Sequence, residues 1–201
     1  MHIIKLSQGK GEVLIKGPSV TSGYYNDPEK TSELFDENGF LKSGDIGQIL
    51  PNGTIKIIDR RKHIFKLAQG EYVAPEKIEN IYVRTQYVQQ VFVDGDSLER
   101  NLVAIVVPEI YPVKKWYKQE TGKDIDFEEI IKDPITNKFI LADLQKMGKE
   151  NKLNSIEQVK SIYLESQPFS VENGLLTPTL KSKRPQLRLK YKETIKDLYK
   201  A

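Results

Sequence analysis

Short hydrophobic stretches separated by turn signals fill the first third of the chain. Residues 11–17 and 54–59 each carry aliphatic side chains next to glycine or Pro-Asn-Gly, a pattern that predicts short β-strands. Between them, Asp27 is followed by Pro28 and Glu29. A capping carboxylate, a proline in the first turn and an acidic residue near the positive end of the dipole predict a helix start. This part predicts a small β-rich unit resembling the rim of a barrel.

The hydrophobic spacing changes after Arg61. Residues 63–74 predict a strand, a glycine turn and a second strand. A helix is predicted to begin at Pro75, because the apolar positions that follow recur at helical spacing. One face of that helix should carry Ile78, Ile81 and Tyr82.

The remaining segments predict a small sheet packed by helices. Residues 88–95, 102–108 and 159–166 read as strands, and the second is apolar on both faces, as in a covered sheet. Residues 133–150 and 184–200 have helical periodicity. We therefore expect an α+β protein: a β-rich segment, 1–61, then an α+β domain, 62–201. The apolar positions of the two helices are Phe139, Ile140, Leu144 and Met147, then Leu187, Tyr191, Ile195 and Leu198.

Composition adds limits to this picture. The chain has 201 residues, of which 38% are hydrophobic and 29% charged, a balance typical of soluble globular proteins. It contains no cysteine, which excludes disulfides, thiolate metal sites and a cysteine nucleophile. No apolar run reaches the about 18 to 20 residues of a membrane helix, and the first residues lack a signal-peptide pattern. We expect an intracellular protein, either cytoplasmic or peripheral on an organelle membrane such as the endoplasmic reticulum.

Several common catalytic motifs are absent from the sequence. It contains no Walker-type phosphate loop, no Gly-x-Gly-x-x-Gly and no Gly-x-Ser-x-Gly. Its only histidines, His2 and His63, are far apart in sequence, so a zinc site is not expected. What remains is a set of polar clusters in predicted turns, at residues 42–45, 59–66, 69–72 and 176–184.

Taken singly, each polar cluster has an ordinary structural interpretation. Asp45 after Gly44 is typical of a turn residue that caps a backbone N–H. The charges of residues 60–62 are typical of a solvated strand end. The basic residues 181–184 lack the interleaved aromatic side chains of single-strand nucleic-acid binders, and no nucleic-acid partner is expected.

The order of the clusters is more informative than any one of them. "GYYND" at 23–27, "SGD" at 43–45, "DRRKHIFKLAQGEYVAPEKIE" at 59–79 and "LLTPTLKSKR" at 175–184 follow one another. Together they resemble the closing third of the adenylate-forming acyl-CoA synthetases, and most closely the eukaryotic long-chain fatty acyl-CoA synthetases. The resemblance runs from about Gly11 onward, and its most specific element is "KLAQGEYVAPEKIE".

This resemblance implies a two-step ligase reaction. A fatty acid attacks ATP to give an acyl-adenylate and pyrophosphate, and coenzyme A then displaces AMP to form the thioester. The family implies that residues 1–61 close the large AMP-binding domain. Residues 62–201 would form a lid that rotates between the two steps.

Roles for individual residues follow from the family motifs. Asp45 would accept hydrogen bonds from the ribose hydroxyls of ATP, and Arg60 would contact the same nucleotide. Lys62 would be the hinge. Gly70 would face coenzyme A in the second step, and Lys66 could contact phosphate from the same face.

The catalytic lysine of adenylation is less directly assigned. In many relatives it follows a glycine near the C-terminus, whereas this chain has Leu180 before Lys181. The resemblance therefore implies Lys181, with Lys183 as the runner-up, as the cation that reaches the carboxylate and the α-phosphate.

The family's phosphate loop, Mg²⁺ ligands and fatty-acid tunnel should precede this segment. The resemblance thus implies that the chain works with a missing N-terminal part and is inactive alone. An alternative function is a binding module whose basic C-terminal helix docks on an acidic membrane surface; the ordinary interpretation is that its lysines solvate a helix packed on the sheet.

Overall fold

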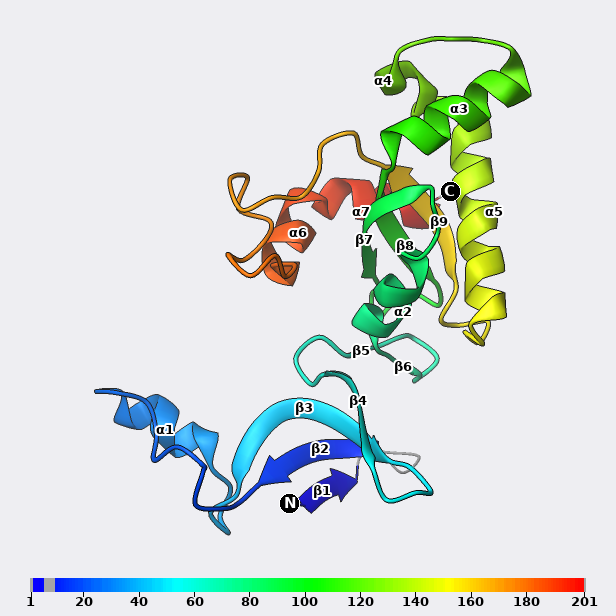
Figure 1. Ribbon diagram of the computed structural model, residues 1–201. Coiled ribbons are helices and arrows are strands. Elements are labelled where there is room, and N and C mark those ends of the chain that lie inside the picture. Colours follow the sequence, from blue (N-terminus) through cyan, green and yellow to red (C-terminus); the bar gives the residue numbers. More distant parts are fainter. Residues whose placement is uncertain (1, 6–9, 201) are drawn as a thin grey trace. The chain divides into compact units, whose positions relative to one another are not determined.

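The computed structural model describes residues 2–5 and 10–200, and the side chains of residues 11–200 (Figure 1). It divides into two compact units, a first unit of residues 1–64 and a second unit of residues 65–201. Within the described residues both units combine strands with helices, which confirms the predicted α+β class.

The first unit is built on one antiparallel sheet with the strand order β1-β2-β3-β4. A short helix, α1, connects β2 to β3, and the Asp27 carboxylate accepts a hydrogen bond from the N–H of Lys30 at 3.0 Å, as expected of a helix cap. The sequence patterns do not predict the first strand. The bounds are β1 His2–Lys5, β2 Lys10–Ile15, α1 Pro28–Leu34, β3 Leu41–Ile49 and β4 Ile55–Arg60.

The second unit begins with a two-stranded hairpin, β5 (Phe65–Lys66) and β6 (Tyr72–Val73), and continues with a three-stranded sheet. In that sheet β8 (Leu102–Pro108) pairs antiparallel with β7 (Val88–Asp94) and parallel with β9 (Val159–Leu164). Every residue of β8 is buried, as its continuous apolar sequence predicts for a central strand.

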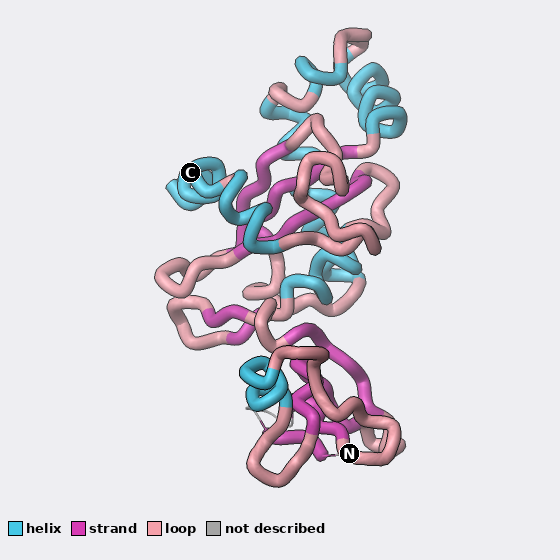
Figure 2. Tube along the Cα trace, turned by 90° about the vertical axis from the view of Figure 1, so that its left-hand side faces the viewer, coloured by secondary structure: helices cyan, strands magenta, loops and turns pink. Residues whose placement is uncertain are grey.

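Helices cover both faces of this sheet, as Figure 2 shows. Alternate residues of β7 and β8 belong to two hydrophobic clusters, one shared with α2, α3 and α5 and the other with α6 and α7. Short helix α4 also contributes to the first cluster. The bounds are α2 Pro75–Tyr82, α3 Ile110–Thr121, α4 Phe127–Ile130, α5 Pro134–Glu150, α6 Arg184–Lys190 and α7 Lys192–Lys200.

The C-terminal helical segment differs from the single run that its periodicity suggests. Helix α6 ends at Lys190, its C-cap residue Tyr191 has φ −99° and ψ 17°, and α7 starts directly afterwards. Tyr191 is buried, and its hydroxyl donates to the Glu165 carboxylate at 2.7 Å. The interruption therefore coincides with a buried tyrosine that is bonded outside the helix. No helix in the described part of the chain is long and apolar enough to cross a bilayer.

Candidate functional site

The first candidate site lies on adjacent strands of the first unit. Asp45 of β3 and Arg60 of β4 are cross-strand partners, and the Arg60 Nε donates to Asp45 Oδ1 at 2.9 Å. Their side chains are 30% and 49% exposed, respectively. The structure thus places Asp45 within a strand, where its carboxylate meets an arginine, instead of in a turn. It brings the two predicted nucleotide-binding residues together at a partly exposed position on β3 and β4.

A buried glutamate fixes the backbone beside Asp45. Glu12 of β2 accepts from the Gly44 N–H at 3.2 Å and from Arg61 Nη1 at 2.8 Å. The Arg61 N–H in turn donates to the Gly44 carbonyl at 2.7 Å. Gly44 has φ +71°, a conformation that favours glycine. The adjacent Arg60 and Arg61 thus pair with different carboxylates, Asp45 and Glu12. Glu12 is a supporting residue that the sequence motifs do not identify.

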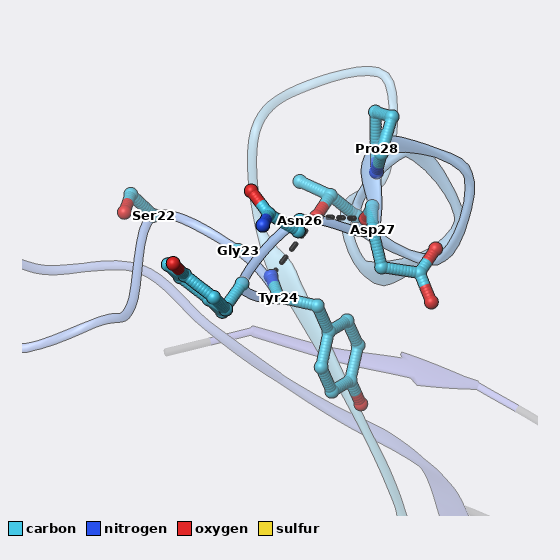
Figure 3. A pocket seen from close by; sticks show the side chains of 8 residues that line it. Ser22, Gly23, Tyr24, Asn26, Asp27 and Pro28 are labelled. Carbon is cyan, nitrogen blue, oxygen red and sulfur yellow. Dashed lines mark hydrogen bonds between the residues drawn. The ribbon is translucent and has the colours of Figure 1, made fainter.

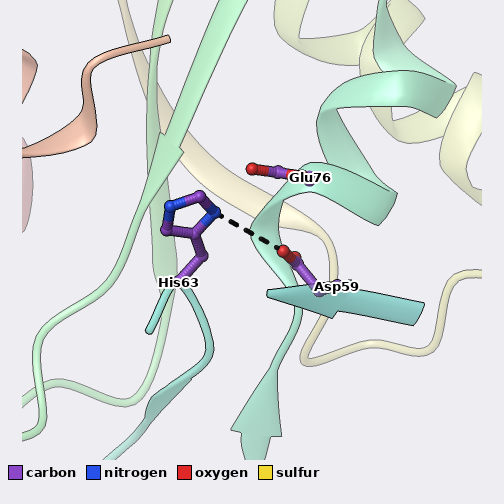
Figure 4. A group of neighbouring side chains, drawn as sticks. All are labelled: Asp59, His63 and Glu76. Atoms are coloured by element: carbon purple, nitrogen blue, oxygen red, sulfur yellow. Dashed lines mark ion pairs between the residues drawn. The ribbon is translucent and has the colours of Figure 1, made fainter. Parts of the chain in front are cut away.

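The rest of the basic run forms the turn after β4. Figure 4 shows the ion pair between His63 Nδ1 and Asp59 Oδ1, at 3.8 Å. Asp59 is buried and also accepts from the Arg60 N–H at 2.6 Å. Lys62, the predicted hinge residue, is exposed in this turn and lies two positions before the end of the first unit. The turn therefore combines the exposed Lys62 with an imidazole that lies beside a buried carboxylate.

The second candidate site is the β5–β6 hairpin of the second unit. The Gly70 N–H donates to the Leu67 carbonyl at 2.8 Å, and the Leu67 N–H donates to the Glu71 carbonyl at 2.9 Å. Gly70 has φ +91°, so a side chain there would be strained. A Cβ added to Gly70 would lie 3.7 Å from Cε of Lys66. The hairpin thus brings together the two residues predicted to face coenzyme A.

The third candidate site is the loop of residues 175–183, which we call the lysine loop. It folds back on itself, because the Thr177 N–H donates to the Lys181 carbonyl and the Lys183 N–H to the Leu175 carbonyl, both at 2.8 Å. Lys181 is exposed near the tip, whereas Lys183 is half-buried at the start of α6. The two lysines therefore differ in access to solvent.

Leu180 has an unusual conformation directly before Lys181. Its φ is +59°, in the left-handed region that glycine adopts most easily. Leucine in this region costs roughly 1–2 kcal/mol. The expected glycine is absent from the sequence, but the backbone has the shape that a glycine would favour. Lys181 therefore directly follows a residue with a glycine-like backbone conformation.

Two further pockets are present, and the second of them overlaps the hairpin site at Phe65 and Lys66. One, of about 550 Å³, is lined by residues 22–28 and Thr31 of the first unit (Figure 3). There the Thr31 hydroxyl donates to the Asp27 carbonyl at 2.7 Å and accepts from the Tyr24 N–H at 2.9 Å. The hydrogen bond from Lys30 lowers the pKa of the Asp27 carboxyl. The polar groups of this motif thus organise the start of α1.

The other pocket, of about 460 Å³, belongs to the second unit. It is lined by side chains of both signs, and Lys66 is the one predicted site residue among them. Arg188 is bonded there to Asp94, with Nε at 2.9 Å from Oδ1. The remaining lining residues are Phe65, Gly95, Asp96, Ser97, Lys192, Ile195 and Lys196.

Charge pairing reduces the case for a membrane-binding C-terminal helix. Lys196 pairs with Glu193 at 3.0 Å, and Lys200 pairs with Asp197 at 2.7 Å. Ile195 and Leu198 pack against the hydrophobic cluster of the sheet. The helix thus has an apolar side that is already used in packing, as in the ordinary interpretation of its sequence.

This combination of fold and motifs also occurs in known proteins. Long-chain-fatty-acid–CoA ligase 1 from Homo sapiens is 54% identical over 193 residues, covering 96% of this chain and 28% of that protein. Long chain acyl-CoA synthetase 7, peroxisomal, from Arabidopsis thaliana is 46% identical over 190 residues, covering 94% and 27%. No family model matches the chain.

Solved structures agree with the sequence relatives. The adenylation domain of a carboxylate reductase from Mycobacterium chelonae has a TM-score of 0.82 and 35% identity, covering 96% of this chain and 28% of that one. The A-PCP didomain of carboxylic acid reductase from Segniliparus rugosus, solved in complex with AMP, has a TM-score of 0.84 and 32% identity, covering 98% and 27%.

The fold and motifs thus define the class: the chain is part of an adenylate-forming protein and matches the C-terminal part of adenylation domains. Within that class it corresponds to a part of the long-chain-fatty-acid–CoA ligases, with 54% identity to one of them across 96% of the chain. The chain spans about 28% of the length of the curated relatives it matches.

Proposed function

We propose that this chain supplies nucleotide contacts, a hinge and a rotating lid to a ligase that joins a long-chain fatty acid to coenzyme A. The observation that carries this proposal is the 54% identity to long-chain-fatty-acid–CoA ligases across 96% of the chain. The paired Asp45 and Arg60, the Gly70 hairpin and the lysine loop give the proposal specific residues.

The chemical problem is that a carboxylate is a poor electrophile. In the first step a carboxylate oxygen of the fatty acid attacks the α-phosphorus of ATP, and pyrophosphate leaves. In the second step the sulfur of coenzyme A attacks the acyl carbon, AMP leaves and the thiol proton passes to solvent. Both steps take place at the same acyl carboxylate, first at its oxygen and then at its carbon, so a protein that exchanges the surface above it can serve both.

Asp45 and Arg60 would bind the nucleotide in both steps. Asp45 Oδ1 accepts from Arg60, and a carboxylate has further acceptor capacity for the two ribose hydroxyls. The exposure of both side chains leaves room for such a ligand. The Glu12 bonds to Gly44 and Arg61 would hold Asp45 in place, so that binding requires little reorganisation.

Lys181 would act in the first step. Its exposed position near the tip of the lysine loop lets a flexible cation reach the carboxylate and the α-phosphate. As the carboxylate attacks, negative charge develops on the oxygens of the α-phosphate, and a positioned cation stabilises it. Lys183, half-buried beside α6, is the runner-up.

Gly70 would act in the second step. Its lack of a Cβ leaves backbone accessible to the pantetheine arm of coenzyme A, with the Lys66 side chain beside it. Lys62, exposed in the turn after β4, would change its backbone angles as the lid rotates. A polar exposed residue can make such a change without uncovering core.

The proposal is tested by following the two half-reactions in the longer ligase that carries this sequence. We expect fatty-acid-dependent release of pyrophosphate without coenzyme A, and release of AMP only after coenzyme A is added. The 201-residue chain alone should release no AMP. Turnover by this chain alone, or AMP release that needs no coenzyme A, would contradict the proposal.

A further inference from the structure

A buried arginine stands at the junction between the lysine loop and α6. Arg184 directly follows the loop, and its side chain is only 6% exposed. Its Nη1 donates to Glu79 Oε1 of helix α2 at 2.7 Å, and its Nη2 donates to the Val93 carbonyl of strand β7. One guanidinium thus joins α6 to α2 and β7, at residues 105 and 91 positions earlier in the sequence.

The same group of atoms satisfies both backbone polar groups of Val93. Glu79 Oε1 accepts from the Val93 N–H at 2.7 Å, while Arg184 binds the carbonyl of the same residue. Strand β7 is at the edge of the three-stranded sheet, where such groups lack a neighbouring strand. Burial raises the pKa of Glu79, and the Arg184 charge opposes the rise. The guanidinium also lies 4.6 Å from the centroid of the buried Phe92 ring.

The other end of the lysine loop is held by hydrophobic packing. Leu175 and Leu176 are buried in the cluster that also contains Phe92 and Leu187. Within the loop, Leu180 donates its N–H to the Thr177 carbonyl at 2.8 Å. The loop is therefore closed on itself and fixed at both ends, by leucines before the tip and by Arg184 after it.

We propose that Arg184, through its bonds to Glu79 and Val93, is a positioning residue that holds the lysine loop so that Lys181 is presented for adenylation. A buried ion pair is weak evidence for stability, because well-packed apolar side chains often stabilise a fold as well or better. The planar guanidinium instead fixes the orientation of the chain at Arg184, because it donates to two acceptors in a fixed geometry. Arg184 lies three residues after Lys181, so a shift at its position is transmitted to the loop tip through a short segment. This role rests on the proposed function of Lys181.

The decisive variant replaces the ion pair by apolar side chains. Arg184→Met combined with Glu79→Leu removes both charges and keeps most of the volume, so no buried charge is left unpaired and the protein should remain folded in the absence of denaturant. Its denaturation midpoint should be lower than that of the parent, because the buried N–H and carbonyl of Val93 lose these partners. Gln186→Met is the matched control, because Gln186 lies on the same helix as Arg184 and is exposed. Two readouts are needed: hydrogen exchange of the amides of residues 177–183, and the rates of the two half-reactions in the longer ligase.

In the double variant we expect faster exchange in the lysine loop and pyrophosphate release slowed by about 100-fold, the size of effect that a displacement of about 1 Å can produce. Thioester formation from supplied acyl-adenylate should stay close to the parental rate, which a general loss of structure would not allow. Gln186→Met should leave both readouts near parental values. A folded double variant with parental loop exchange or parental adenylation overturns the proposal.

A second variant covers failure of the double variant to fold. Arg184→Lys keeps the charge and loses the two-pronged geometry, and adenylation should slow by about tenfold, less than in the double variant. An unchanged adenylation rate in folded Arg184→Lys overturns the proposal. Lys181→Ala is measured in parallel: if it adenylates normally, the proposed role of Lys181 fails, while loop exchange in the double variant still decides whether Arg184 holds the loop.

Discussion

The two units of this chain use the same pair of chemical groups in different surroundings. In the first unit, Arg60 meets Asp45 with 49% and 30% of their side chains exposed. In the second unit, Arg184 meets Glu79 with 6% and 12% exposed. The distances are similar, 2.9 Å and 2.7 Å, so burial is the main difference between the two pairs.

This difference decides what each pair can do. Exposed ion pairs typically contribute about 0–1 kcal/mol, because water competes for both groups. Asp45 can therefore exchange part of its hydrogen bonding for a ligand at little cost. Breaking a buried pair leaves an uncompensated charge, so Arg184 and Glu79 remain bonded and can hold other segments in place.

The largest expected effect on stability comes from truncating the buried arginine, compared with the same change at the exposed one. Arg184→Ala should lower the free energy of unfolding of the second unit by about 3–5 kcal/mol, because Glu79 keeps a buried charge without its partner. Arg60→Ala should change stability by at most about 1 kcal/mol. Denaturation followed by the fluorescence of Trp116, the only tryptophan, reports on the second unit, and circular dichroism reports on both. Equal losses for the two variants would remove the contrast between the pairs.

The next effect concerns the exposed pair as a ligand site. Asp45→Asn removes the negative charge and one acceptor while keeping the shape. We expect the KM for ATP in the longer ligase to rise by about 10- to 100-fold, in line with about 1.5–3 kcal/mol for a hydrogen bond to a charged group. Glu33→Gln, an exposed carboxylate on α1, is the control and should leave KM unchanged. An unchanged KM in Asp45→Asn would argue against the nucleotide role.

A smaller effect is expected at a buried hydroxyl of the second unit. The Tyr82 oxygen accepts from the Val159 N–H at 3.2 Å, and burial raises the pKa of Tyr82 to about 12. Tyr82→Phe should lower the free energy of unfolding by about 1–3 kcal/mol at neutral pH, because the buried N–H loses its acceptor.

The raised pKa of Tyr82 also predicts a pH dependence. The folded-state value lies above the unfolded value of about 10, so the stabilisation is complete below pH 10 and is lost as the pH rises through 12. The difference in stability between parent and Tyr82→Phe should therefore decrease over this window in pH-dependent denaturation. A constant difference up to pH 12 would contradict the assignment.

The smallest expected effect tests the backbone at the lysine loop. Leu180→Gly should raise the free energy of unfolding by about 0.5 kcal/mol, since relief at φ +59° exceeds the entropic cost of glycine. Leu189→Gly, at an exposed position within α6, should lower it by about 1 kcal/mol. Changes of opposite sign in the free energy of unfolding, measured by chemical denaturation, would support a strained Leu180. A lower free energy of unfolding in both variants would contradict it.

Local patterns were sufficient to predict much of the fold. Asp27 followed by Pro28 marks the start of α1, and continuous apolar sequence marks the central strand β8, because capping and burial act over a few neighbouring residues. The break at Tyr191 was not predictable in this way. It accompanies a hydrogen bond to Glu165, and helical periodicity carries no information about such tertiary partners.

The candidate site follows the same division. Motif order predicts Asp45, Arg60 and Gly70, and the structure pairs the first two directly. The supporting carboxylates Glu12 and Glu79 had no local signal, because each acts on residues far away in sequence: Glu12 on Gly44 and Arg61, and Glu79 on Arg184. Such supporting roles depend on contacts between residues far apart in sequence, and only the folded structure reveals them.

The most direct test of the lid is to measure both half-reactions of the longer ligase in three variants. Lys181→Ala should slow pyrophosphate release by about 100- to 1,000-fold and spare thioester formation from acyl-adenylate. Gly70→Leu should block thioester formation while pyrophosphate release continues, and Lys183→Ala should affect both steps little. If Lys181→Ala and Gly70→Leu fail at the same half-reaction, the two surfaces do not alternate and the account is wrong.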